Sequence, residues 1–141
     1  MCPDAKAAER VAKAARFPNA QVPGIRGLGN PVTHTVWGGE GVTMRHYLDS
    51  ASESIVVMVQ IETVEGMNNV EEIAAVPGVG AYTSPASLCS QLTSITDVLF
   101  IGPFDLSIAH GYAPPSPDPV PEVEVLLAKI RDAAHKHGKK V

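Results

Sequence analysis

Two short apolar runs constrain the fold more than any other feature of this chain. Ile55 to Ile61 reads IVVMVQI, and Val98 to Ile101 reads VLFI. Neither run alternates between apolar and polar residues as a half-exposed strand does, so each predicts a strand that is covered on both faces. Strands of this kind are typical of parallel sheets in α/β proteins, where helices pack against the sheet.

Helical patterns separate and flank these runs. Ala5 to Phe17 places small apolar residues on one face, and a shorter helix is expected over His46 to Glu53. Asn68 to Glu71 has the Asn-x-x-Glu spacing of a helix start. Pro119 to His137 has the clearest apolar stripe, and Gly138 follows it as a C-terminal stop. The order of strands and helices therefore predicts a parallel α/β sheet.

The chain is too short for the closed form of such a fold. It has 141 residues, whereas a (β/α)8 TIM barrel takes about 250 residues. The fold class expected is therefore α/β, as the middle segment of a partial (β/α)8 TIM barrel. Residues Asn19 to Val42 contain many Gly and Pro residues and are expected to form an irregular loop, with a possible short strand around Ile25.

Composition excludes several classes of partner. A net charge of -4 provides no basic patch for nucleic acid or for an anionic membrane surface. No apolar run reaches the roughly 20 residues needed to span a bilayer, and the N-terminus lacks the layout of a signal peptide. The two cysteines, Cys2 and Cys89, are expected to be plain thiols in a reducing compartment. We therefore expect a cytoplasmic protein.

Acidic residues follow both predicted strands. Glu62 comes directly after the first strand, and Asp105 follows the second in Gly102-Pro103-Phe104-Asp105. The carboxyl ends of parallel strands are where ligands bind, so the two carboxylates could converge there on Mg²⁺ or Mn²⁺. Gly102 would let backbone amides approach the ligand. The alternative is that each carboxylate is a helix cap or a solvated loop residue.

Four other polar residues have two interpretations each. Arg26 lies between glycines and could clamp a carboxylate or brace its loop, and bracing is favoured. His34 and His46 could relay protons, but solvated loop histidines are commoner. Ser107 is expected to be a helix-start cap and not a nucleophile.

The two strand ends also carry a family resemblance. The segment VMVQIETVEGMNNVEEIAAVPGV, followed by DVLFIGPFDLS, resembles the HpcH/HpaI aldolase/citrate lyase family of metal-dependent class II pyruvate aldolases. The upstream PGIRGLGNP is similar to a Gly-x-Arg-Gly loop in that family, and the last helix with GKKV also fits. The resemblance covers nearly all of the chain outside Gly80 to Thr96.

The resemblance implies a fold, a site and a reaction. Family members are (β/α)8 barrels that assemble into oligomers, so a homo-oligomer is expected. It implies that Glu62 and Asp105 bind the metal, Mg²⁺ or Mn²⁺, and that Gln60, Phe104 and Asp105 hold a keto acid substrate. The reaction implied is reversible aldol cleavage of a 2-keto-4-hydroxy acid to pyruvate and an aldehyde. The family's catalytic His and Arg lie on earlier strands, and no position here matches them, so this chain is expected to be inactive alone.

The uncharged stretch from Gly80 to Thr96 interrupts the family pattern. Relatives run directly from Pro-Gly-Val into Asp-Val-Leu-Phe, so residues 80–96 are interpreted as an insertion within a partial aldolase domain that spans residues 1–141. One hypothesis is a retained intron that is translated in frame. The alternative is a surface loop at the end of the fold opposite the site, although such connections usually have about 2 to 6 residues.

Three functions remain open from the sequence. The first is the metal-dependent lyase. The second is a non-catalytic fragment, or an interaction partner of a full-length barrel subunit. The third is a metal-independent citryl-thioester lyase, which has the same fold but is less similar in these motifs.

Overall fold

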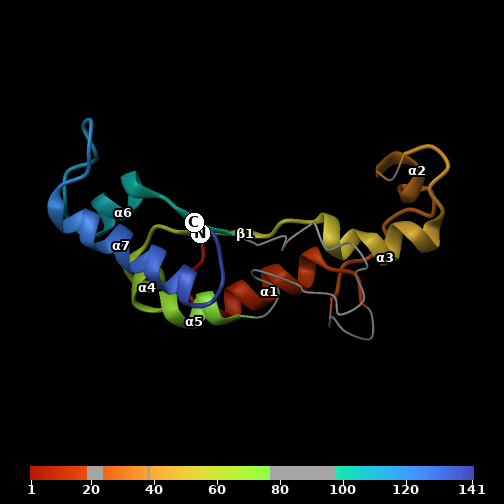
Figure 1. Ribbon diagram of the computed structural model, residues 1–141, viewed down its shortest axis with the longest axis horizontal. Coiled ribbons are helices and arrows are strands. Elements are labelled where there is room, and N and C mark those ends of the chain that lie inside the picture. Colours follow the sequence, from red (N-terminus) through yellow and green to blue (C-terminus); the bar gives the residue numbers. More distant parts are fainter. Residues whose placement is uncertain (19–23, 38, 77–97) are drawn as a thin grey trace.

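The computed structural model describes residues 1–18, 24–37, 39–76 and 98–141 (Figure 1). The predicted insertion, residues 80–96, lies outside the described residues. The elements in chain order are α1 (Ala5–Ala15), α2 (Thr33–Trp37), α3 (Met44–Ser54), β1 (Met58–Ile61), α4 (Val64–Asn68), α5 (Val70–Ala75), β2 (Val98–Ile101), α6 (Pro103–Ala109) and α7 (Pro121–Lys136).

The two predicted strands form one parallel pair. Met58 lies opposite Val98, and the register continues to Ile61 opposite Ile101. Main-chain hydrogen bonds also reach both outer edges of the pair. The N–H of Cys2 donates to the carbonyl of Gln60 at 2.9 Å, and the N–H of Leu99 donates to the carbonyl of Lys140 at 3.0 Å. The prediction of a parallel α/β arrangement is confirmed.

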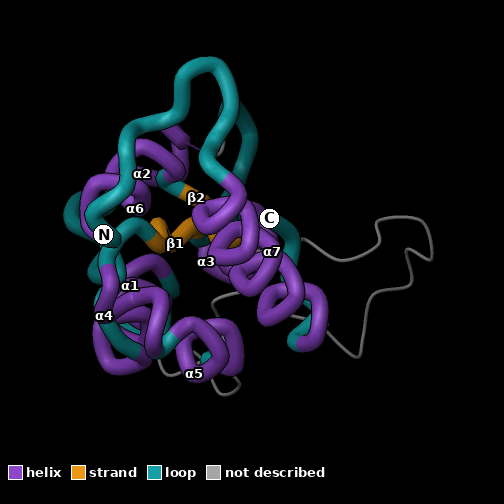
Figure 2. The backbone as a smooth tube through the Cα atoms, turned by 90° about the vertical axis from the view of Figure 1, so that its left-hand side faces the viewer, coloured by secondary structure: helices purple, strands orange, loops and turns teal. Residues whose placement is uncertain are grey.

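One face of this sheet is covered by helices and the other is open. Val59, Ile61 and Leu99 are buried in a core shared with α1, α4, α5 and α7, which lie on one side of the strands (Figures 1 and 2). On the opposite face the exposed fractions are 60% for Met58 and 51% for Phe100. The prediction that both faces are covered is therefore wrong for the residues described, because the described helices of the body pack on a single face.

The first strand is also shorter than its apolar run predicts. β1 begins at Met58, three residues after Ile55. The carbonyl of Ile55 accepts a hydrogen bond from Nη1 of Arg16 at 3.1 Å and not from a neighbouring strand. A side chain of α1's C-cap residue thus takes the place of ladder pairing at the start of the run.

The helix predicted to start at Asn68 starts earlier. α4 begins at Val64, and Oγ1 of Thr63 accepts a hydrogen bond from the N–H of Gly66 at 3.0 Å. Asn68 ends that helix, and Asn69 precedes α5 without capping it through its side chain. Nδ2 of Asn69 donates instead to the carbonyl of Pro3 at 3.0 Å. The capping-box prediction is wrong, because the hydroxyl of Thr63, two residues after the strand, caps the first turn.

The last helix agrees closely with its prediction. α7 covers Pro121–Lys136, and Val123, Ile130 and Ala134 of the predicted stripe are buried. Gly138 has a φ of +69°, which L-residues with a Cβ rarely adopt. The next N–H, of Lys139, returns to the carbonyl of Ala134 at 2.8 Å, which closes the helix end.

Residues 24–37 and 39–54 form a second part of the molecule, which we call the α2–α3 arm. It extends away from the body, which we define as the sheet with α1 and α4 to α7 (Figure 1). α2 was expected to be loop, whereas α3 contains the predicted helix and begins two residues earlier, after the cap at Thr43. Ile25 is not in a strand, and its N–H donates to the carbonyl of Lys13 at 2.8 Å.

Candidate functional site

The carboxyl end of β1 presents two polar side chains. Gln60 lies within the strand, and Glu62 follows it directly. Because side chains alternate along a strand, residues 60 and 62 share a face with Met58, which is the open face of the sheet. Glu62 is nevertheless only 8% exposed. The local fold therefore leaves little of this residue exposed, at the edge where a ligand is expected.

Gly102 lies beside both of these side chains. The register of the strands continues to place Glu62 alongside Gly102, whose N–H donates to the carbonyl of Ile61 at 3.3 Å. The space that a Cβ of Gly102 would occupy lies 2.9 Å from Oε2 of Glu62 and 3.0 Å from Nε2 of Gln60. The Glu62 carboxylate and the Gln60 amide thus both lie beside Gly102, where the chain passes from β2 to α6.

Asp105 and Phe104 lie in the first turn of α6, immediately after β2. Pro103 is the first residue of the helix, a position where the N–H that proline lacks would have no helical partner. Both Phe104 and Asp105 are exposed. Glu62 and Asp105 are therefore placed at the carboxyl ends of neighbouring parallel strands, as the sequence predicts. Whether they share a cation is treated below as a proposal.

Glu62 does not act as a helix cap. Among the described residues, no N–H or O–H group donates to its carboxylate, and Thr63 caps α4. The Glu62 oxygens are not among the buried atoms that lack a partner in the described residues, so water can reach them and a ligand could replace that water. Asp105 is exposed at the start of a helix, where negative charge is favourable without a metal, so the cap interpretation of Asp105 stays open.

The described residues contain no larger cage of ligands. Within residues 1–18, 24–37, 39–76 and 98–141, no group of three or more His, Cys, Asp or Glu side chains is placed to hold a metal. Mg²⁺ commonly keeps several waters and takes only one or two protein carboxylates. Two acidic residues with water and a chelating substrate suit such an ion.

Ser107 is not the predicted helix-start cap. It lies inside α6, fully buried, and Oγ donates to the carbonyl of Pro103 at 2.6 Å. Nδ1 of His110 lies 2.9 Å from the carbonyl of Leu106 in the same helix. The prediction failed because Gly102 and Pro103 begin the helix four residues before the serine.

Arg26 makes contacts that brace its loop. Its guanidinium carbon lies 4.6 Å from the ring centroid of Phe17, and Nη2 donates to the hydroxyl of Tyr47 at 3.3 Å. The rings of Phe17 and Tyr47 meet edge to face with centroids 5.8 Å apart. A cation over one ring and a hydrogen bond to the other join the end of α1 to α3. These contacts favour the bracing interpretation over the carboxylate clamp.

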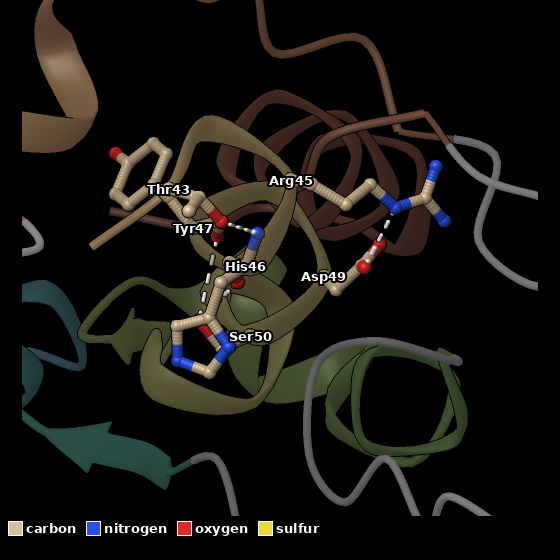
Figure 3. Close-up of polar contacts among 6 residues, drawn as sticks. All are labelled: Thr43, Arg45, His46, Tyr47, Asp49 and Ser50. Carbon is tan, nitrogen blue, oxygen red and sulfur yellow. Dashed lines mark hydrogen bonds and ion pairs between the residues drawn. The ribbon is translucent and has the colours of Figure 1, made fainter. Parts of the chain in front are cut away.

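The predicted proton-relay histidines lie in the α2–α3 arm. His46 is in the first turn of α3, where its N–H donates to Oγ1 of Thr43 at 3.2 Å, and its carbonyl accepts from Oγ of Ser50 at 2.8 Å (Figure 3). His34 lies in α2. Among the described residues, no hydrogen bond joins either ring to Glu62 or Asp105. His34 was expected in a loop and lies in α2, whereas His46 lies in α3, which contains the helix expected over His46 to Glu53.

Sequence reasoning missed the crowding at Gly102 and the cap at Thr63. Thr is a preferred helix N-cap residue, so Thr63 could have been identified. The tight approach of Gly102 depends on the exact register of two strands, which no local pattern encodes.

No helix in the described parts of the chain combines the length and apolarity that crossing a bilayer requires.

Comparison with known proteins identifies relatives along the whole chain. Residues 1–141 match the family model described as HpcH/HpaI aldolase/citrate lyase. The chain is 34% identical over 141 residues to the hydroxypyruvate/pyruvate aldolase of Chromohalobacter salexigens, covering 99% of the chain and 45% of that protein. It is 33% identical to the 4-hydroxy-2-oxo-heptane-1,7-dioate aldolase of Shigella flexneri, covering 98% of the chain and 44% of that protein. The chain thus spans less than half the length of these relatives.

Solved structures give the same picture. A family protein from Burkholderia cenocepacia J2315 superposes with a TM-score of 0.72 at 30% identity, over 99% of this chain and 46% of that one. Macrophomate synthase gives a TM-score of 0.71 at 20% identity, over 99% and 42%, and this likeness concerns the fold alone. The fold is therefore α/β and corresponds to part of a TIM barrel.

Proposed function

This chain belongs to the HpcH/HpaI aldolase/citrate lyase family, and on that premise we propose that Glu62 and Asp105 bind a divalent cation, Mg²⁺ or Mn²⁺, for aldol chemistry on a keto acid. The observation that carries the proposal is the placement of Glu62 and Asp105 after the neighbouring parallel strands β1 and β2, at the carboxyl edge of the sheet. A hard cation such as Mg²⁺ or Mn²⁺ takes carboxylate oxygens as ligands.

The chain's own residues divide the work of binding. Gln60 has an amide that can donate to the carboxylate of a keto acid, and its Nε2 lies close to Oε2 of Glu62 through their shared contact with Gly102. Phe104 and Asp105 would border the same ligand from the start of α6. When bound, the cation supplies positive charge at the keto oxygen, where negative charge develops as the carbon–carbon bond breaks. No side chain of this sequence is assigned to proton transfer.

The proposed substrate class is based on the names of the relatives. The two curated relatives reported above are named as aldolases, one for hydroxypyruvate and pyruvate and one for a hydroxy-oxo-dicarboxylic acid. We propose the same reaction type here, with reversible cleavage of a 2-keto-4-hydroxy acid to pyruvate and an aldehyde. A homo-oligomer in the cytoplasm belongs to the same proposal.

A second candidate function rests on the open face of the sheet. Met58 and Phe100 expose apolar surface that a packed parallel sheet normally covers. A chain with that surface could act as a non-catalytic fragment or as an interaction partner of a full-length barrel subunit. This candidate predicts binding to such a subunit without turnover.

Titration with Mn²⁺ followed by a pyruvate-release assay tests the proposal. We expect Mn²⁺ to bind the chain, and we expect Glu62→Gln and Asp105→Asn each to weaken binding by at least about 10-fold, since supporting residues alone typically change metal affinity by that much. Glu65→Gln, which removes an exposed carboxylate from the first turn of α4, is the matched control and should bind like the parent.

The outcomes separate the two candidates. Pyruvate release that requires Mg²⁺ or Mn²⁺ and disappears in Glu62→Gln supports the lyase. Because this chain is expected to be inactive alone, association with a full-length family subunit, and not the lack of turnover by itself, supports the non-catalytic partner. Unchanged Mn²⁺ affinity in both acidic variants would overturn the metal site.

A further inference from the structure

Gly102 sits where the main chain after β2 passes closest to the polar end of β1. A Cβ at this position would lie 2.9 Å from Oε2 of Glu62, 3.0 Å from Nε2 of Gln60 and 3.0 Å from Cβ of Glu62. Real Cβ atoms essentially never approach another heavy atom within 3.0 Å, and few approach within 3.4 Å. The space that glycine leaves free is therefore taken by the two side chains of the candidate site.

The backbone conformation does not explain a glycine here. Gly102 has φ -102° and ψ 80°, and a negative φ of this size is open to any L-residue. By contrast, Gly138 follows α7 at φ +69°, where glycine is favoured for conformational reasons. At Gly102 it is therefore the lack of space, and not the backbone conformation, that requires a residue without a side chain.

The three neighbouring atoms differ in how far they can yield. Oε2 of Glu62 and Nε2 of Gln60 are at the ends of flexible side chains and can rotate away. Cβ of Glu62 is fixed to the main chain. The segments after β1 and β2 are held together there by the 3.3 Å hydrogen bond from the N–H of Gly102 to the carbonyl of Ile61. A methyl group at position 102 would thus displace the Glu62 carboxylate and the Gln60 amide. It would also push apart the two segments that follow β1 and β2.

We infer that Gly102 is a positioning residue, which sets where the Glu62 carboxylate and the Gln60 amide lie at the end of β1. The inference rests on the proposed function for its consequence: metal–ligand distances tolerate only about 0.2 Å of error, so a displaced carboxylate binds the cation less well. This role differs from the one expected from the sequence, in which the glycine brings amides close to the ligand.

The test compares Gly102→Ala with Gly27→Ala. A Cβ added at Gly27 would meet open space, with nothing within 4 Å, and Gly27 has no positive φ, so it controls for adding one methyl group to a glycine. Titration with Mn²⁺ should show affinity weakened by about 10-fold or more in Gly102→Ala, a typical effect of disturbing the support of a ligand. Gly27→Ala should bind like the parent.

A metal-free readout separates this inference from the proposed function. In NMR spectra without Mn²⁺, Gly102→Ala should shift the side-chain amide of Gln60 and the carboxyl carbon of Glu62, whereas Gly27→Ala should not. If the parent binds no Mn²⁺, the metal site fails, and these shifts alone decide the inference. If both resonances and the Mn²⁺ affinity stay at parental values in Gly102→Ala, the inference is overturned.

A second variant covers the case in which Gly102→Ala does not fold. The double substitution Gly102→Ala/Glu62→Gly moves the glycine to the opposite position of the register and restores the space. Recovery of a cooperative melt in the double variant supports crowding against Glu62. A double variant that is as unfolded as Gly102→Ala would contradict it.

Discussion

The body and the α2–α3 arm are built from the same kinds of helix, yet they bury very different amounts of apolar surface. The body closes a continuous core between one face of the sheet and its helices, and Ile61, Ile73 and Leu99 are completely buried there. In the arm, Tyr47 and Ala51 pack with Phe17 in a small separate cluster. The comparison indicates that parallel strand pairing brings segments that are distant in sequence into one core, whereas the formation of a local helix does not.

The electrostatic contacts of the two parts differ in the same way. In the arm, Arg45 pairs with Asp49 one turn away in α3 at 2.8 Å, as Figure 3 shows. In the body, Lys136 of α7 pairs with Glu71 of α5 at 3.0 Å, which joins helices that are far apart in sequence. Local contacts support a helix, and long-range contacts support the fold. Matched substitutions in the body and in the arm can test this contrast.

The largest effect is expected from a cavity in the body. Leu99→Ala removes a completely buried side chain from β2, so we expect a loss of about 2 to 5 kcal/mol in the free energy of unfolding. Urea denaturation followed by circular dichroism measures it. Leu48→Ala makes the same deletion at a partly buried position of the arm and should cost clearly less. Equal costs would show that the two parts form one cooperative core.

A medium effect is expected from the helix caps. Oδ1 of Asp4 accepts from the N–H of Ala7 at 2.7 Å at the start of α1, and Thr43 caps α3 with a 3.2 Å bond. Removing such a cap costs about 1 kcal/mol. Asp4→Ala should lower global stability by that amount, whereas Thr43→Ala should increase hydrogen exchange mainly within residues 44–54. Faster exchange throughout the body in Thr43→Ala would contradict the separation.

The smallest effect concerns the ion pair between α5 and α7. The hydrogen bond from Lys136, with a further contribution from His137, lowers the pKa of Glu71. A carboxyl whose pKa is lower in the folded state stabilises the fold above its unfolded pKa, and this contribution is lost as the pH falls through the folded pKa. Glu71→Gln should therefore lower the melting temperature slightly at neutral pH.

The pH dependence provides the control for that prediction. The difference between Glu71→Gln and the parent should shrink as the pH falls below the ordinary glutamate pKa of about 4.3 and disappear below the lowered pKa of the folded state. Asp49→Asn breaks only the pair within α3, so it should leave the melting of the body unchanged at either pH. A difference for Glu71→Gln that persists in strong acid would assign the effect to packing instead of charge.

The sequence predicted best where a periodic pattern and a long-range partner agree. β2 has the predicted bounds, Val98–Ile101, because its apolar run ends at Gly102 and Pro103. The stripe of α7 was predictable because it packs against the sheet it was expected to cover. The start of the helix after β1 was misplaced, because Asn68 and Thr63 both resemble caps, and it is Thr63 whose hydroxyl accepts from the N–H of Gly66.

The candidate site was predictable in identity and less so in environment. The edge of the sheet that carries Glu62 and Asp105 follows from strand direction alone. The burial of Glu62 and its closeness to Gly102 depend on the register of β1 and β2 and on how tightly the chains approach. The exposure of Met58 could not be inferred from the sequence. A continuous apolar run indicates which residues can be buried, but it does not indicate which face of the strand the described helices cover.

The main-chain bond between Cys2 and Gln60 gives the edge of β1 a built-in chemical reporter. The thiol of Cys2 is buried, and burial raises its pKa, so few molecules carry the reactive thiolate. An alkylating reagent can therefore reach this sulfur only when the residues before α1 detach from the strand. In a chain with Cys89→Ser, the rate of alkylation would time how often the segment beside Gln60 opens to solvent.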